Sequence, residues 1–177
     1  MTSDMRGYSI PARGKLFPSN PAVDDQFYRT DRNLEYFFNG SYWLTTVQYV
    51  IPLTTYTAFP TNRSVTSNAL MAGIPGFAST YDFWMEEMRW SSYVPTTNDF
   101  THYWRCDLQK ITAPSTSTNI TSPTTASDTT NTWTQHTTTI NALLGTSVIY
   151  LQINAVKVSG PGNLDLAAVS VVGRLVG

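Results

Sequence analysis

The sequence has very little of what metal sites, disulfide frameworks and catalytic centres are built from. It contains one cysteine, Cys106, and two histidines, His102 and His136. A single cysteine cannot form a disulfide within the chain, which excludes a small secreted scaffold held together by disulfides. Neither histidine stands at metal-ligand spacing from the other or from Cys106, so we expect no zinc site and no cofactor.

Charged side chains are also scarce. They make up 13% of the chain, and the formal net charge is −1, whereas an ordinary globular protein carries about 25% charged residues. Such a balance directs the protein toward neither nucleic acid nor an anionic membrane. No apolar run reaches the roughly 20 residues of a membrane span, and the amino-terminal residues lack the apolar region of a signal peptide. We therefore expect a soluble protein made in the cytoplasm, with no nucleic-acid or membrane partner.

Threonine, serine and asparagine take the places that charged residues leave free. Threonine is β-branched and fits a pleated sheet, whereas long helices depend on Glu, Lys, Arg and Ala. Hydrophobic residues make up 41% of the 177 residues, enough for the core of one domain of ordinary size. The composition therefore predicts an all-β protein.

Residues 1–26 are predicted to form an extended amino-terminal arm, because prolines and glycines recur through them. One interpretation is a flexible terminus; the other is an arm that becomes ordered on a partner. Its mixture of basic and apolar side chains favours the second. The candidate partner-binding residues are Arg6, Tyr8, Ile10, Arg13, Lys15, Leu16 and Phe17.

Residues 27–46 are predicted to form a small β-hairpin module. Asn39-Gly40 lies between two aromatic runs and suits a type I′ turn, which needs two positive φ angles. We expect strands at 34–38 and 41–45. Because an isolated hairpin is marginal in water, its aromatic side chains must pack on the main domain, on another copy of the chain or on a neighbouring protein.

Residues 47–177 are predicted to form a β-sandwich domain. The segment 47–79 is rich in Pro and Thr and has only weak strand signals, at 47–53 and 69–71. Clearer strands are expected at 81–94, 100–111, 132–140, 147–158 and 163–176, with a turn at 159–162 between the last two. Residues 167–172 are apolar on both faces of the last strand, which indicates cover on both faces and points weakly to an oligomer.

No catalytic constellation emerges from the sequence. Cys106 is expected to be a buried neutral thiol. Glu86 and Glu87 are adjacent and point to opposite faces of a strand, whereas Asp82 and Glu86 share a face and leave a glycosidase-like pair as a remote alternative. No phosphate-binding glycine loop or Gly-x-Ser-x-Gly motif occurs. We expect no catalytic residue and no enzyme.

Four tryptophans have two interpretations. They fill the core of the sandwich, or they stack on sugar rings at its surface. Trp133 is the least expected in the core, because it interrupts a long Thr- and Ser-rich stretch. The four are Trp84, Trp90, Trp104 and Trp133.

The stretch 18–46 resembles a module of tailed-bacteriophage virion structural proteins. The matching residues are Pro-Ser-Asn-Pro at 18–21, Asp-x-Phe-Tyr-Arg-Thr-Asp at 25–31 and Tyr-Phe-Phe-Asn-Gly-x-x-Trp-Leu-Thr at 36–45. The resemblance brings no catalytic residues. The rest of the chain is similar in style to the jelly-roll sandwiches that trimerise on phage capsids or in fibres. It implies a jelly-roll-like antiparallel β-sandwich preceded by the arm and the hairpin.

The resemblance leads to one principal expectation and one alternative. The principal one is a capsid decoration or cement protein at the capsid surface of the virion, made in the host cytoplasm. It would bind the major capsid protein, form a homotrimer and stabilise the head. The alternative is a receptor- or glycan-binding fibre or tail protein. An enzyme acting on cell-wall polysaccharide is a third and weaker interpretation.

Overall fold

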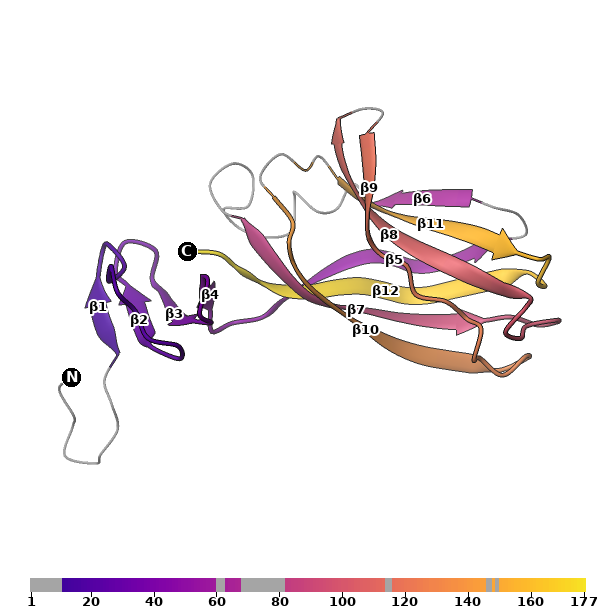
Figure 1. Ribbon diagram of the computed structural model, residues 1–177, viewed down its shortest axis with the longest axis horizontal. Helices are drawn as coiled ribbons and strands as arrows, with labels where there is room; N and C mark the ends of the chain where they lie inside the picture. The colour runs from indigo at the N-terminus through magenta and orange to yellow at the C-terminus, as the bar shows by residue number, and fades with distance from the viewer. Residues whose placement is uncertain (1–10, 60–62, 68–81, 114–115, 146–147, 149) are drawn as a thin grey trace.

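The computed structural model describes residues 11–59, 63–67, 82–113, 116–145, 148 and 150–177 (Figure 1). Every regular element within these ranges is a β-strand, which confirms the prediction of an all-β protein. Three of the candidate partner-binding residues, Arg6, Tyr8 and Ile10, lie outside the described residues, as does the strand signal at 69–71.

A small four-stranded sheet lies at one end of the molecule (Figure 1). Its strands are β1 (Ala12–Gly14), β2 (Gln26–Arg29), β3 (Leu34–Phe38) and β4 (Trp43–Thr45), adjacent in that order. β1 pairs with β2 in parallel, and the other neighbours are antiparallel. Residues 11–26, expected within an extended arm, therefore supply a strand to the same sheet as the aromatic hairpin, because β1 occupies the edge of β2 that the hairpin leaves open.

The hairpin between β3 and β4 exists, but its turn is not of type I′. Phe38 pairs with Trp43, so four residues form the loop. Gly40 has a φ of 98°, whereas Asn39 is not among the residues with positive φ. The Asn39 side-chain oxygen instead accepts hydrogen bonds from the backbone N–H groups of Ser41 and Tyr42, at 3.0 and 2.8 Å. Asparagine therefore acts here through its side chain, and only glycine supplies the left-handed conformation.

The other eight strands form a sandwich of two antiparallel sheets (Figure 1). The first sheet has the order β10-β7-β12-β5 and the second the order β6-β11-β8-β9. The bounds are β5 Tyr49–Phe59, β6 Arg63–Ser67, β7 Phe83–Tyr93, β8 Tyr103–Ala113, β9 Thr116–Thr121, β10 Trp133–Leu143, β11 Tyr150–Val158 and β12 Leu164–Leu175. β5 occupies the start of the segment expected to be a connector, and Pro52 is tolerated in it because β5 lies at a sheet edge.

The strand order of the sandwich is nested. The first of the eight strands pairs with the last, the second with the seventh, the third with the sixth and the fourth with the fifth. This pairing divides the strands between the two sheets in the order of a jelly roll, the architecture of two interlocked Greek keys. The antiparallel β-sandwich expected from the sequence is therefore present.

Buried and half-buried residues alternate along β11. Leu151, Ile153 and Ala155 are all buried in the core, whereas Tyr150 and Gln152 on the other face are half-buried. A strand with one face on the core shows this period of two. The pattern places β11 over the shared core of the two sheets.

A β-bulge explains the apolar appearance of both faces in β12. Ala167 pairs with Ser91 and Ser170 pairs with Arg89, so two residues, Ala168 and Val169, lie opposite one residue of β7. Ala168 is exposed and has a φ of 50°. The extra residue shifts the inward positions by one, from Leu164 and Leu166 to Val169 and Val171. A second subunit is therefore not needed to explain this pattern, although Val172 is buried outside the main core cluster.

The last two strands are joined by a turn but do not pair as a hairpin. β11 and β12 belong to different sheets, and residues 159–162 carry the chain from one sheet to the other. A Cβ at Gly162 would come within 2.2 Å of the Thr96 carbonyl oxygen, and the Trp104 indole N–H donates to the Gly162 carbonyl at 2.8 Å. Glycine is therefore required at position 162 because the backbone packs closely against Thr96, and not because the chain turns back in a tight hairpin.

Candidate functional site

The small sheet has an aromatic core of its own. Phe27, Tyr36 and Trp43 are buried together, and Phe17 packs against them. The Phe17 ring stacks on Trp43 with centroids 5.0 Å apart and meets Tyr36 edge-on at 5.1 Å. Such aromatic pairs contribute about 1 kcal/mol each beyond the area they bury. Phe17, a candidate partner-binding residue, thus helps to hold the small sheet together.

An ion pair covers this aromatic core. The Arg29 guanidinium lies 4.7 Å from the centre of the Phe17 ring and donates two hydrogen bonds to Asp31, at 2.8 and 2.7 Å. These hydrogen bonds from Arg29 are the main cause that lowers the pKa of Asp31 to about 2. The Asp31 carboxylate is therefore ionised at neutral pH, and the pair orders the turn between β2 and β3.

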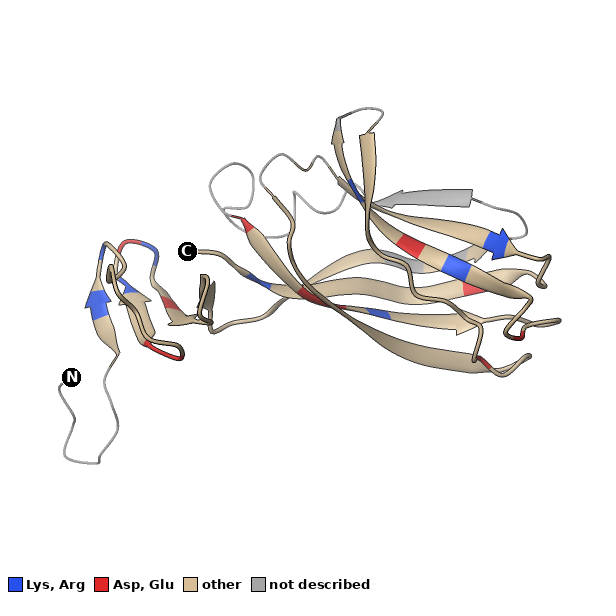
Figure 2. Cartoon of the chain, in the orientation of Figure 1, with Lys and Arg blue, Asp and Glu red and all other residues tan. Residues whose placement is uncertain are grey.

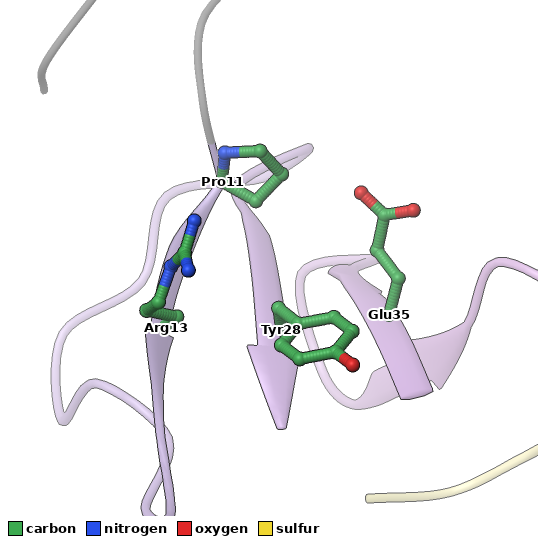
Figure 3. A pocket seen from close by; sticks show the side chains of 4 residues that line it. All are labelled: Pro11, Arg13, Tyr28 and Glu35. Carbon is green, nitrogen blue, oxygen red and sulfur yellow. The ribbon is translucent and has the colours of Figure 1, made fainter. Parts of the chain in front are cut away.

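The opposite face of the small sheet is open. Residues of both charges lie on this sheet (Figure 2). Arg13, Tyr28 and Glu35 are register partners on three adjacent strands, and together with Pro11 they line a depression of about 330 Å³ (Figure 3). Within the described residues, neither Arg13 nor Glu35 forms an ion pair. The row therefore places a cation, a phenol ring and a carboxylate side by side on this face.

Other exposed residues lie in the segment between β1 and β2. Lys15 is exposed, and Leu16 is 84% exposed. Val23, in the loop that leads to β2, is 62% exposed. Four of the seven residues singled out from the sequence are thus described, and three of them, Arg13, Lys15 and Leu16, are exposed.

The small sheet is joined to the sandwich chiefly through the end of β12. The Arg174 side chain donates from Nε to Glu86 at 2.6 Å and from Nη1 to the Thr45 carbonyl at 2.8 Å. Leu44 forms a β-bridge with Val176. The Arg174 guanidinium also lies 5.2 Å from the centre of the Phe37 ring on β3. One cation therefore connects β4, β7 and β12 with β3.

Sequence reasoning missed a buried polar cluster at the edge of the sandwich. His136 Nε2 lies 2.9 Å from Ser92 Oγ and 3.0 Å from Asp128 Oδ2, and Ser92 Oγ also donates to Asp128. The His136 ring stacks on Trp90 with centroids 4.0 Å apart. Residues of these three types form catalytic triads, but a triad needs serine and aspartate on different nitrogens of the ring. Here both contact Nε2, so the cluster has the geometry of a structural network.

Removing the Asp128 carboxylate is expected to destabilise the sandwich. Asp128→Ala would leave two nearly buried groups, the Ser92 hydroxyl and the His136 ring, without their shared acceptor, at a cost of about 2 to 3 kcal/mol in the free energy of unfolding. Asp128→Asn keeps the shape and one acceptor oxygen and should cost less. Urea denaturation measures both values, and equal stability of Asp128→Ala and the wild type would refute the structural role.

The remaining candidate catalytic groups are engaged in structural contacts. Asp82 Oδ1 accepts hydrogen bonds from the N–H groups of Phe83 and Gly145, both at 2.8 Å, and Glu86 binds Arg174. Cys106 is buried, as expected, and burial raises the pKa of its thiol. No group of three metal-ligating side chains occurs in the part of the chain that the structure describes.

The four tryptophans differ in their exposure to solvent. Trp90 and Trp104 are buried in the main core, and Trp84 is half-buried against Tyr42. Trp133 is 48% exposed, in agreement with its position in a Thr-rich stretch. Core packing therefore accounts for two of them and leaves Trp133 as the surface candidate.

Comparisons with known proteins identify no family. No family model and no curated protein matches the chain. Two chains from solved structures of infectious bursal disease virus, of the Gx and Gt strains, are 13% identical to it, with TM-scores of 0.33 and 0.29. The matches cover 78% of this chain but only 42% and 43% of those chains. Among the described residues, no helix is long and apolar enough to cross a membrane. Similarity at this level carries no conclusion about function.

Proposed function

We propose that the protein is a virion structural protein that decorates a capsid, with the small sheet as its attachment module. The observation that carries the proposal is the open face of that sheet. It presents Arg13, Tyr28 and Glu35 in one row, with the exposed Leu16 nearby in the chain. A sheet that buries a core on one side and leaves a mixed charged and apolar face on the other suits binding to a larger surface.

The sandwich supports the proposal by analogy of fold. Jelly rolls occur in viral capsid proteins, lectins and cupins, and a fold alone does not decide among them. Cupins carry chemistry in their barrels, whereas the candidate catalytic groups described here are used in structural contacts. The support for a virion role therefore comes from the exposed surfaces of the molecule and not from its fold.

The partner in this proposal is the major capsid protein. Each 100 Å² of apolar surface buried on attachment would contribute about 2.5 kcal/mol before the costs of association are subtracted. A protein that bridges neighbouring capsid subunits would add this stabilisation across their boundary. In this way decoration would strengthen the head.

Assembly as a homotrimer is part of the proposal. The outer side of the edge strand β5 exposes the apolar residues Val50, Pro52, Tyr56 and Ala58 in alternation. An apolar stripe on a sheet edge is a typical surface for association with a second copy. The predicted molar mass in solution is three times the 19.7 kDa of one chain.

Co-sedimentation with shells of the major capsid protein tests the proposal. The wild-type protein is expected to pellet with the shells, and Leu16→Glu to lose most of the binding, since it replaces an exposed apolar side chain of the attachment module by a carboxylate without disturbing a buried contact. Trp133→Ala, on the sandwich, serves as the matched control and should pellet like the wild type. Wild-type protein that stays in the supernatant, or Leu16→Glu protein that pellets normally, would contradict the proposal.

A further inference from the structure

We infer that the outer face of β7 and β10, at the end of the sandwich far from the small sheet, binds a neutral glycan with Trp133 as its stacking platform. This inference goes beyond the proposed attachment to a capsid, because it concerns another surface and another class of ligand. The two surfaces lie at opposite ends of the molecule, since β7 begins near the small sheet and Trp133 pairs with its last residue, Tyr93 (Figure 1).

The platform is an aromatic pair held in place by its surroundings. Trp133 lies opposite Tyr93, with ring centroids 5.5 Å apart and an interplanar angle of 33°. The Tyr93 hydroxyl donates to the Asn131 side-chain oxygen at 2.6 Å, and the Asn131 backbone N–H donates to the Val94 carbonyl at 2.8 Å. Trp133 is 48% exposed to solvent, although the contact with Tyr93 fixes the orientation of its ring. The exposed face of the ring is therefore preorganised for stacking.

A shallow polar depression continues from this platform. Gln135 and Ser91 are register partners two residues further along the same face, at about 7 Å from the aromatic pair. They line a depression of about 500 Å³ together with Thr137, Arg89, Ser170 and the bulged Ala168. Amide and hydroxyl groups both donate and accept hydrogen bonds, which matches the hydroxyls of a sugar. The β12 bulge, with its small alanine, leaves room beside them.

The charge of this face selects a neutral ligand. β10 carries no Lys, Arg, Asp or Glu along its whole length (Figure 2). The arginine in the depression, Arg89, forms an ion pair with Glu87 two residues away. His136, which also lines it, has its Nε2 atom 3.0 Å from the Asp128 carboxylate. An anionic polymer would therefore find no uncompensated positive charge here. The C–H face of a pyranose ring, by contrast, packs on an aromatic ring while its hydroxyls reach the amide and hydroxyl groups.

An extended peptide is the competing occupant, because β10 is an edge strand. Peptide addition would use the backbone edge and would depend little on the Trp133 ring. The bulge between Thr139 and Ala142 also interrupts the regular edge that an added strand needs. The aromatic pair and the polar depression instead lie on the face of the sheet, where a sugar chain would rest.

Binding of a panel of neutral and anionic oligosaccharides to the full-length protein tests the inference. At least one neutral oligosaccharide is expected to bind, and titration calorimetry should show its affinity reduced at least tenfold by Trp133→Ala and less by Trp133→Phe, which keeps an aromatic face. Gln135→Ala should weaken binding as a second, independent variant. Leu16→Glu, at the other end of the molecule, should bind the glycan like the wild type.

Three outcomes would overturn the inference: no neutral oligosaccharide binds, only anionic ones bind, or Trp133→Ala binds as well as the wild type. The variants also separate this inference from the proposed function. Loss of capsid binding in Leu16→Glu with intact glycan binding would support both. Glycan binding by a protein that never attaches to shells would leave this inference standing and reject the attachment.

Discussion

Replacing Trp43 by alanine is expected to unfold the small sheet while the sandwich remains folded. The core cluster of the sheet has three buried aromatic side chains, and Trp43 contacts Phe17, Phe27 and Phe38. Truncation of a buried Trp costs about 3 to 5 kcal/mol, and so small a sheet has little stability to lose. The sandwich keeps its own core cluster and should not follow.

Hydrogen exchange measured segment by segment distinguishes the two parts. Trp43→Ala should abolish amide protection over residues 26–45 and leave β8 and β11 protected as in the wild type. Trp133→Ala, which removes a half-exposed ring of the same kind, is the control and should change neither region appreciably. Normal protection of the small sheet in Trp43→Ala, or loss of protection throughout the chain, would contradict a separately cored module.

Replacing Arg174 by alanine is expected to uncouple the small sheet from the sandwich. The change removes the ion pair with Glu86 and the hydrogen bonds to the Thr45 and Thr46 carbonyls, and leaves Glu86 without its cation. Breaking a mostly buried ion pair costs about 3 kcal/mol or more, and both side chains here are about four-fifths buried. The loss should be concentrated at the contact between β4 and the end of β12.

Arg174→Lys is the matched variant, since it keeps the charge but not the planar set of donors. It should retain part of the pairing with Glu86 and lose the carbonyl contacts. Thermal unfolding and the exchange rates of residues 43–46 and 174–177 report the coupling. If Arg174→Ala left both unchanged, the account of the junction would be wrong.

The sequence predicted the positions of strands better than their pairing. The alternation of Leu151, Ile153 and Ala155 follows from burial of one face, which is a local property. The choice of sheet is not local: β11 and β12 are separated by a short turn sequence, yet each pairs with strands far away in the chain and they belong to different sheets. The β-bulge at Ala168 could not be predicted from the sequence either, because no glycine or other characteristic residue type occurs there.

The candidate site was predictable only in part. The exposure of Arg13, Lys15 and Leu16 agrees with their place in a segment of mixed basic and apolar residues. Their setting was not predictable, because the parallel pairing of β1 with β2 brings Arg13 beside Tyr28 and Glu35 without any local sequence signal. Phe17 could not be separated from its exposed neighbours by sequence, since its burial depends on Trp43.

The buried cluster of Ser92, Asp128 and His136 shows the same limit. Asp128 follows Ser92 by 36 positions in the sequence, and His136 follows it by 44. Asp128 and His136 are 8 positions apart. The aspartate lies in a Thr- and Ser-rich segment with no apolar pattern around it. Only the register of β7 against β10 brings the histidine to the serine, and that register is a tertiary property.

Electron cryomicroscopy of shells of the major capsid protein, incubated with the full-length protein, tests the central claim most directly. The account predicts added density in which the narrow four-stranded sheet contacts the shell and the eight-stranded sandwich projects outward, with the Trp133 face away from the shell. Shells without added density, or density in which the sandwich contacts the shell and the small sheet faces solvent, would contradict it.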